Sequence, residues 1–445
     1  MLLNILYCIA LWIASPLVIY RSARYGRYRR GVRQKFFGVR ADDFSPSLAD
    51  SSSADSAPVA WFHAVSVGEV NLVAGLIDSF RKAHPEYQVV VSTSTDTGYD
   101  LAKSRFLDLP VFFCPLDFTW AVDQTFQTLR PRLLVLAELE LWPNLIKHAG
   151  KWGCRVAIAN GRLSERSARS YLRFSAVIAR TFARIDWIGC QDAEIAERFV
   201  DCGANANAVA ITGSIKFDNA PLSRDTPEIS RIARWAAVDP WHQVVIAGST
   251  QNGEEELALA TYRQLSASHR ELRLAIVPRH RERFDQVAAL IQAAGFQVRR
   301  RSEHLTPAEH WSSDTVILVD SVGELRNWWG ISRIAFVGGS FGDRGGQNML
   351  EPAGYGSAVC FGPNTQNFRD IARRLLTGGG AVRLNTPADL TAFVARCLDE
   401  PPAADALGRQ ARSIVMSHRG ATEKTVQQLS RLLGVGAIQS KSRAA

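Results

Sequence analysis

Side chains suited to chemistry follow the short apolar runs of this 445-residue chain, where β-strands would end. In the first half they are Glu69 after "VAWFHAV", Glu138 and Glu140 after "RLLVL", and Lys216 after "AVAITG". In the second half they are Pro278, Arg279 and His280 after "LRLAIV", Gly323 and Glu324 after "TVILVD", and Arg344, Asn348 and Glu351 after "SRIAFV". Because the carboxyl ends of parallel strands meet at one edge of a sheet, where ligands bind, we expect these residues to form the site.

Glu69 has two interpretations. Ser66-x-x-Glu69 is the capping-box pattern, in which Ser caps a helix and Glu bonds back to the amide of the cap residue. Glu69 is also placed to act as a general base, because a carboxylate in a first helical turn is favoured by the helix dipole and stays ionised. The two roles are compatible, and the pattern alone does not choose between them.

Glu138 and Glu140 alternate along the chain, so on a strand both would lie on one face. Two such acids could hold a divalent cation. They could equally form an acidic edge that caps the next helix. The sequence has no Asp-x-Asp and no His near this pair, which favours the acidic edge over a metal site.

The second half carries residues suited to a nucleotide. Arg279 could bind phosphate with both arms of its guanidinium, or it could be a solvated charge within "RHRERF". The loop "GGSFGDRGGQN" is Gly-rich and precedes a helical stretch, as phosphate-binding loops do, although it matches neither G-x-G-x-x-G nor the Walker pattern. Asn348 and Glu351 would share a helix face, and a Glu there often accepts hydrogen bonds from ribose hydroxyls.

The elements that position these residues follow a repeated pattern. Continuous apolar runs alternate with helical stretches, which predicts parallel βαβ units. "IKFDNAPLSRDTP" interrupts the pattern, so we expect two consecutive open α/β domains, 58–218 and 219–435, the second closed by helices over 403–433. The Ser-, Ala- and Asp-rich residues 41–57 are expected to be a linker, and 436–445 a tail.

The charge distribution predicts a membrane anchor. Residues 1–20 carry no charge, and 21–40 hold eight Arg and Lys and no acid, which is most of the net charge of +9. An apolar run of this length with basic residues after it predicts an anchor whose following domain is cytoplasmic, drawn to anionic lipids rather than to nucleic acid. Pro16 keeps an interfacial position open for this run. The seven scattered Cys indicate reduced thiols in a cytoplasmic protein.

Taken together, these segments resemble the 3-deoxy-D-manno-octulosonic acid (Kdo) transferases of lipopolysaccharide synthesis. The resemblance extends over nearly the whole chain, in the motifs "HAVSVGE", "ELWPNL", "NGRLSERS", "TGSIKFD", "VPRHRERF", "GEL", "FVGGSF", "RGGQNMLEPA" and "GPNTQNF". Their order and spacing make it specific, unlike any one motif alone. Gln251, Gln347 and Met349 stand where that family commonly has His, His and Pro.

The resemblance implies a GT-B type fold, with two Rossmann-like domains facing a cleft and an N-terminal membrane-anchor helix. It implies an inverting glycosyltransferase without metal or other cofactor, which moves Kdo from CMP-Kdo to a lipid A precursor (lipid IVA) at the cytoplasmic face of the cell inner membrane. By motif, Glu69 is the proton acceptor, and Glu138 and Lys216 stabilise the transition state. The CMP contacts are carried over to Pro278, Arg279, Val322, Gly323, Glu324, Asn348, Met349, Leu350 and Glu351.

Two alternatives remain at this stage. A GT-B transferase that uses a UDP-sugar on a lipid acceptor would share the fold and differ in the nucleotide. A membrane-anchored scaffold with a degenerate nucleotide site would keep its biological function without Glu69. The polar residues retained at the strand ends favour an enzyme over the scaffold.

Overall fold

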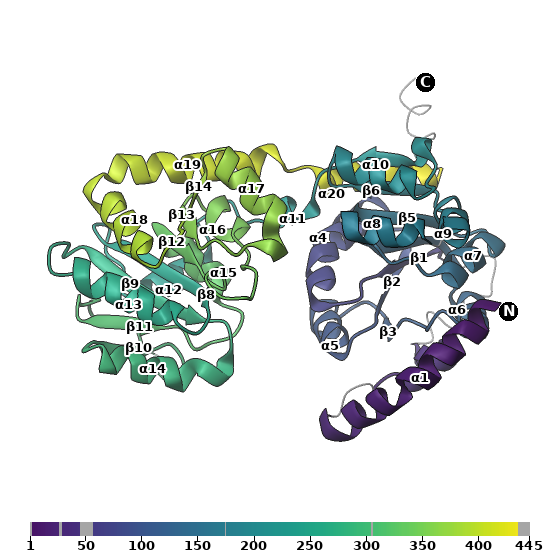
Figure 1. Cartoon of the computed structure of the whole chain (residues 1–445), viewed down its shortest axis with the longest axis horizontal. Coiled ribbons are helices and arrows are strands. Elements are labelled where there is room, and N and C mark those ends of the chain that lie inside the picture. Colours follow the sequence, from purple (N-terminus) through teal and green to yellow (C-terminus); the bar gives the residue numbers. More distant parts are fainter. Residues whose placement is uncertain (1, 26–28, 45–56, 174, 304–305, 435–445) are drawn as a thin grey trace. The chain divides into compact units, whose positions relative to one another are not determined.

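The computed structural model describes residues 2–25, 29–44, 57–173, 175–303 and 306–434. The chain forms two compact units, Met1–Asn219 with Arg419–Ala445, and Ala220–His418. Each unit is built on one seven-stranded sheet covered by helices (Figure 1). All strand pairs described are parallel, so the predicted pair of parallel α/β domains is confirmed.

The sheet of the first unit has the order β3-β2-β1-β4-β5-β6-β7. Its strands are β1 (Val59–His63), β2 (Gln88–Thr93), β3 (Val111–Phe113), β4 (Pro131–Ala137), β5 (Arg155–Gly161), β6 (Trp187–Cys190) and β7 (Val209–Ile211). Its helices are α1 (Leu2–Tyr25), α2 (Val32–Phe37), α4 (Val67–Ala83), α5 (Asp96–Arg105), α6 (Thr119–Leu129), α7 (Pro143–Lys151), α8 (Glu165–Leu172), α9 (Ser175–Phe182), α10 (Ala193–Asp201), α11 (Ile215–Asp218) and α20 (Ala421–Leu432), with 3₁₀ turns η1 (Ala41–Asp43) and η2 (Ala206–Ala208).

The central strands are buried on both faces. On β1, Trp61 belongs to one hydrophobic cluster and its neighbour Phe62 to another on the opposite face. Side chains alternate between the two faces of a strand, so a strand covered on both sides must be apolar throughout. This is why the continuous runs in the sequence marked these strands.

The second unit has the order β10-β11-β9-β8-β12-β13-β14. Its strands are β8 (Gln243–Thr250), β9 (Leu272–Pro278), β10 (Gln297–Arg300), β11 (Thr315–Leu318), β12 (Ile334–Val337), β13 (Ala358–Phe361) and β14 (Ala381–Arg383). Its helices are α12 (Pro227–Trp235), α13 (Glu254–Leu265), α14 (Phe284–Ala293), α15 (Leu325–Trp328), α16 (Leu350–Gly354), α17 (Arg369–Thr377), α18 (Ala388–Asp399) and α19 (Pro401–Ser417), with 3₁₀ turns η3 (Arg281–Arg283), η4 (Trp329–Ile331) and η5 (Gln366–Phe368).

The last helix differs from the expected organisation. The sequence placed 403–433 together in the second domain, but α20 packs on α4 and α11 of the first unit. The Asp218 carboxylate accepts hydrogen bonds from the amides of Gly420 and Thr422 at 2.6 Å each, which fixes the start of α20. The chain therefore divides after Asn219 and returns to the first unit at Arg419.

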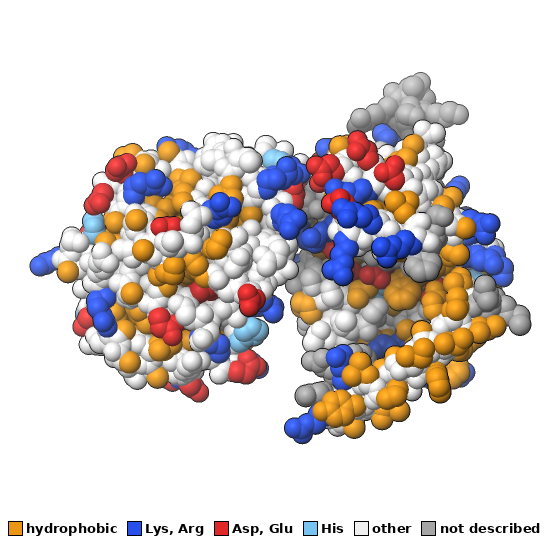
Figure 2. All heavy atoms as spheres, viewed as in Figure 1, with side chains coloured by type: hydrophobic (Ala, Val, Ile, Leu, Met, Phe, Trp, Pro, Cys, Tyr) orange, Lys and Arg blue, Asp and Glu red, His pale blue; other side chains and the backbone are white. Residues whose placement is uncertain are grey.

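Helix α1 is long and apolar enough to cross a membrane by length and composition: an 18-residue window within Leu3–Arg24 has a mean hydropathy of 1.9, and none of that window is buried. Figure 2 shows hydrophobic side chains along its length. Polar contacts attach its first turns to the same unit: Tyr7 donates to Asp117 (2.8 Å) and Asn4 to Thr119 (2.7 Å). Most of the predicted linker and all of the predicted tail lie outside the described residues.

Candidate active site

Glu69 lies in the first turn of α4, directly after β1. Its carboxylate accepts the amide of Val65 at 2.8 Å and the hydroxyl of Ser66 at 3.3 Å. The predicted capping box is therefore wrong in detail. Ser66 is the N-cap residue, but its hydroxyl accepts no cap hydrogen bond, and Glu69 reaches the amide before the cap rather than the amide of the cap. The local contacts hold the carboxylate of Glu69 instead of closing the helix end.

The pKa of Glu69 also differs from expectation. Burial raises the pKa of Glu69, the nearby charge of Glu138 adds to this rise, and the hydrogen bonds from Val65 and Ser66 together with Lys216 oppose it. The sequence predicted an ionised group favoured by the helix dipole, but desolvation is the largest effect. A carboxylate with a raised pKa binds a proton more strongly, which suits a general base.

We expect Ser66→Ala to move the acid limb of the pH–rate profile to higher pH, because the hydroxyl bonds the charged form of Glu69. Stability should change by no more than about 0.5 kcal/mol, since no cap hydrogen bond is lost. Kinetics across pH and thermal unfolding of the same samples measure both. A loss of stability with an unchanged pH profile would show that Ser66 serves the helix and not the carboxylate.

Glu138 follows β4, whose last residue is Ala137. It adopts a left-handed conformation with φ of 54°, so Glu138 and Glu140 are not on a strand and the predicted shared strand face is wrong. Lys216, in α11, pairs with Glu138 at 3.1 Å between Nζ and Oε1. Both side chains are partly buried, and the pair joins two segments that are far apart in the sequence.

Glu140 completes a group of three carboxylates, Glu69, Glu138 and Glu140, which we call the acidic cluster. It accepts the indole N–H of Trp142 at 2.8 Å. Burial raises the pKa of Glu140 to about 7, and the charges of Glu69 and Glu138 contribute to the rise. Glu140 can be recognised in the sequence as a strand-end acid, but it was not predicted to be catalytic, because nothing in the sequence indicates how deeply its carboxylate is buried.

Glu140→Gln is expected to stabilise the protein at pH 8 and to have a much smaller effect at pH 5. The folded-state pKa of about 7 lies above the usual value of 4.5, so the folded wild type binds more protons and loses stability as pH rises between these values. The amide removes this dependence while keeping an acceptor for Trp142. Urea unfolding at both pH values measures the change in stability. Glu197→Gln, which removes an exposed carboxylate of α10, is the control. An equal effect of Glu140→Gln at pH 5 and pH 8 would contradict the prediction.

His63 is the imidazole nearest in sequence to Glu69, and it is not suited to act as the base. Burial lowers the pKa of His63 to about 4, and its ring bonds Ser92 through Nδ1 at 2.9 Å to Oγ. The ring is therefore neutral at pH 7 and fully buried. Glu69 is the better acceptor of a proton at this strand end.

The candidate residues of the second unit lie at the ends of β9 and β11 and after β12, which belong to one parallel sheet. Pro278 is the last residue of β9 and is buried, and the exposed Arg279 follows it. The amide of Arg279 donates to the carbonyl of Thr250 at 3.1 Å, at the end of the neighbouring β8. The Arg279 side chain makes no hydrogen bond or ion pair with another described residue, which leaves it available to an anion.

The predicted phosphate-binding loop is occupied at its start by a protein carboxylate. Glu254, at the start of α13 and 2% exposed, accepts the amides of Gly339 (2.7 Å), Ser340 (2.9 Å) and Phe341 (3.1 Å). A Cβ at Gly338 would lie 2.7 Å from the same carboxylate, so this position requires glycine. These amides therefore cannot bind a phosphate, and for Gly339–Phe341 the sequence prediction is wrong.

The loop after β11 is fixed by an ion pair that joins it to the chain after β10. Glu324 bonds the guanidinium of Arg301 through both oxygens, at 3.0 and 3.1 Å, and also accepts the hydroxyl of Ser321. Burial by itself would raise the pKa of Glu324, but these contacts outweigh burial and hold the pKa below its usual value. Val322 is 75% exposed and Gly323 has a φ of 91°, so this tight turn presents its backbone to solvent.

The segment Asn348–Glu351 begins α16. Asn348 accepts the amide of Leu350 at 3.1 Å. Burial raises the pKa of the partly buried Glu351, with Arg326 and Asn348 opposing the rise. Met349 and Leu350 are 0% and 2% exposed, so they pack beneath this segment and present no side-chain surface to a ligand.

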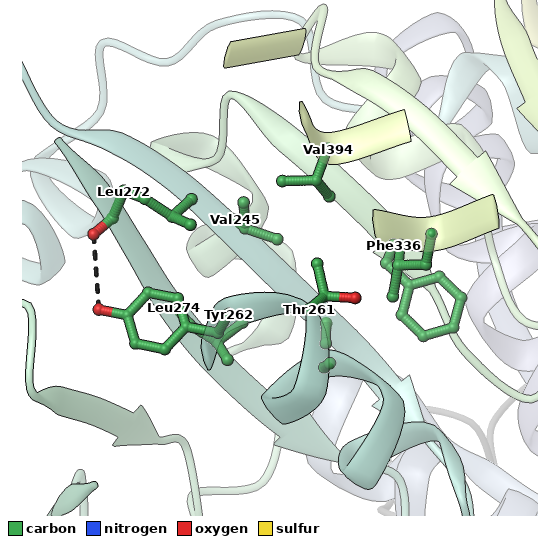
Figure 3. Close-up of a pocket in the computed structure, with 10 residues that line it drawn as sticks. Val245, Thr261, Tyr262, Leu272, Leu274, Phe336 and Val394 are labelled. Carbon is green, nitrogen blue, oxygen red and sulfur yellow. Dashed lines mark hydrogen bonds between the residues drawn. The ribbon is translucent and has the colours of Figure 1, made fainter. Parts of the chain in front are cut away.

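A small apolar cavity in the second unit lies inside its core. Figure 3 shows its lining residues on the sheet and on helices α13 and α18, with Tyr262 donating a hydrogen bond to the carbonyl of Leu272. None of the lining residues is one of the strand-end candidates. Among the described residues, no group of three or more His, Cys, Asp or Glu side chains is arranged to hold a metal ion.

Comparison with solved structures identifies the class. The UDP-GlcNAc 2-epimerase from Neisseria meningitidis bound to UDP-GlcNAc superimposes with a TM-score of 0.57 and 12% identity, over 84% of this chain and 99% of that chain. At this identity the likeness shows the fold alone. With the two parallel sheets, it places the chain in the GT-B fold class.

Comparison with related sequences identifies the family. The family model for 3-deoxy-D-manno-octulosonic-acid transferase (kdotransferase) matches residues 24–219. A 3-deoxy-D-manno-octulosonic acid transferase of Haemophilus influenzae is 34% identical over 95% of this chain and 97% of its own length, and one of Bordetella pertussis is 32% identical over 96% and 99%. The chain belongs to the family of Kdo transferases, and it is therefore a glycosyltransferase.

Proposed function

We propose that this protein moves Kdo from CMP-Kdo to a lipid A precursor, lipid IVA, with inversion at the anomeric carbon and Glu69 as the general base. The observation that carries the proposal is the state of Glu69, a partly buried carboxylate with a raised pKa at a strand end, held by Val65 and Ser66. Membership of the Kdo transferase family supports the donor sugar.

The reaction needs a single displacement. The acceptor hydroxyl oxygen bonds to the anomeric carbon as its proton passes to Glu69, and the bond from that carbon to the phosphate oxygen of CMP breaks. CMP leaves as a phosphate monoester. Arg279 would stabilise the negative charge that develops on it, and we propose that no metal is required.

The pair of Lys216 and Glu138 adjoins the base. Lys216 lowers the pKa of Glu69 and Glu138 raises it, so the two charges of the pair act on the pKa of the base in opposite directions. We assign both residues to stabilisation of the transition state. Glu138→Gln alone would leave Lys216 with an excess positive charge beside Glu69, which weakens the base.

We assign the CMP contacts to the second unit. Arg279 binds the phosphate, and Glu351 accepts hydrogen bonds from the ribose hydroxyls. Pro278, Met349 and Leu350 are buried, so they shape the site by packing beneath it. Val322, Gly323, Glu324 and Asn348 supply the remaining contacts.

The proposal places the protein at the cytoplasmic face of the inner membrane. Helix α1 is the anchor, and the eight Arg and Lys of residues 21–40 bind the anionic head groups of membrane lipids. Such a position gives the enzyme access to an acceptor that does not leave the membrane.

A transfer assay tests the proposal. The full chain is incubated with CMP-Kdo and lipid IVA in nonionic detergent with EDTA, and the product is analysed by mass spectrometry. We expect a mass increase of one or more Kdo residues. Absence of product from folded protein would reject Kdo transfer, and competition binding of CMP against UDP would then test for a UDP-sugar donor.

A further inference from the structure

The chain from residue 162 to residue 184 is strongly basic. It contains six Arg and one Glu, and it includes α8. The four arginines Arg162, Arg166, Arg169 and Arg173 are all exposed. Figure 2 shows the blue side chains gathered over α8. The net charge of the whole chain does not reveal this basic segment, because acidic residues elsewhere offset its positive charge.

These arginines begin beside the acidic cluster. Arg162 is the first residue after β5, and its amide donates to the carbonyl of Glu138 at 3.4 Å. Strand β5 pairs with β4 up to Ala137 and Ala159, so both strands end together. The basic segment thus starts at the edge of the sheet that carries Glu69 and Glu138.

Helix α8 is oriented so that its basic side faces solvent. Ser164 caps it by accepting the amide of Ser167 at 3.1 Å, and Ala168 is buried against the core. Positions 166, 169 and 173 are spaced i, i+3 and i+7, which places them on one face. Because Ala168 fixes the inner face, the basic face is exposed.

Most of the arginines of this segment are not ion-paired. Arg169 pairs with Glu165, and Arg198 of the neighbouring α10 pairs with Glu194. Arg162, Arg166 and Arg173 make no ion pair with any described residue. An uncompensated patch of one sign raises the local concentration of the opposite charge and attracts an anionic partner.

We infer that Arg162, Arg166 and Arg173 bind a phosphate group on the head group of the acceptor lipid. The inference rests on the proposed function, because it gives the phosphorylated acceptor a place beside the base. Arginine binds phosphate through two parallel N–H groups, which fixes direction as well as distance. Leu172 and Val177 of the same basic segment are exposed apolar side chains, which suit the acyl part of a lipid.

The test compares Arg162→Gln, Arg166→Gln and Arg173→Gln, combined in one full-length variant, with the wild type in nonionic micelles. We expect the KM for phosphorylated lipid IVA to rise about tenfold or more, since hydrogen bonds to a charged group are lost. The kcat and the KM for CMP-Kdo should change little. With chemically dephosphorylated acceptor the variant and the wild type should have the same KM.

The matched control removes three exposed cations from other parts of the same unit: Arg105→Gln, Arg132→Gln and Lys151→Gln. An unchanged KM in the first variant, or an equal rise for both acceptors, overturns the inference. So does a loss of binding to phosphatidylglycerol vesicles with an unchanged KM in micelles, which assigns the arginines to the membrane. If the wild type transfers no Kdo, the proposed function fails, and direct titration of both glycolipids still tests the arginines.

Discussion

Glu69→Gln is expected to reduce kcat for Kdo transfer by about a hundredfold or more, the scale of a general base. The amide has the same shape, its oxygen can still accept the amide of Val65 and its NH2 group can donate to the hydroxyl of Ser66, but it cannot take a proton from the acceptor. The fold and the affinity for CMP-Kdo should therefore remain. Steady-state kinetics, donor titration and thermal unfolding of the same preparation measure these three quantities.

Two further variants test whether the loss of kcat is specific to the carboxylate of Glu69. Glu197→Gln removes an exposed carboxylate of the same unit and should leave kcat unchanged. Glu69→Asp keeps the charge but shortens the side chain, so it should retain more activity than the amide and lose the contact with Val65. If Glu69→Gln keeps full activity, another group is the base and the contacts of Glu69 with Val65 and Ser66 are only structural.

The sequence predicted the central strands because they are buried on both faces. It missed β3, β10 and β14, which lie at the edges of their sheets and pair on one side. Strand β10 reads "QVRR" and has no buried residue, and the other two are three residues long. A short or polar edge strand is stabilised by its neighbour, which local periodicity does not record.

The candidate site was predicted in its residues but not in its contacts. Glu69 and Glu138 were found because strand ends can be located from apolar runs. The pairing of Glu138 with Lys216 and the depth of Glu140 depend on how distant segments meet, and neither has a local pattern. In the same way, Glu254 fills a Gly-rich loop that the sequence assigned to phosphate, because a loop's amides do not show which anion they bind.

The segment after β9, which carries the proposed phosphate-binding residue Arg279, is held in place by a buried ion pair. Glu255, fully buried in α13, binds Arg283 of η3 through both oxygens at 2.7 and 3.0 Å and accepts the hydroxyl of Thr250 at 2.7 Å. Arg283 is 15% exposed. The pair therefore ties the chain that follows Pro278 and Arg279 to the helix behind it.

Arg283→Ala is expected to lower the free energy of unfolding of the second unit by about 3 kcal/mol, because it leaves Glu255 buried without a partner charge. Arg281→Ala, which removes an exposed arginine of the same turn, should cost far less. Urea unfolding of the full chain, followed by hydrogen exchange in each unit, separates the two units. If the loss of hydrogen-exchange protection were confined to the first unit, the Arg283–Glu255 pair would not be what stabilises the second unit.

A double-mutant cycle identifies the physical cause. On a Glu255→Gln background the buried charge is absent, so Arg283→Ala should cost much less than it does in the wild type. Equal costs on both backgrounds would mean that Arg283 acts through packing. Because the pair holds the segment that carries Arg279, Arg283→Ala should also raise the KM for CMP-Kdo severalfold while the KM for the acceptor stays the same, which links the stability of this turn to donor binding.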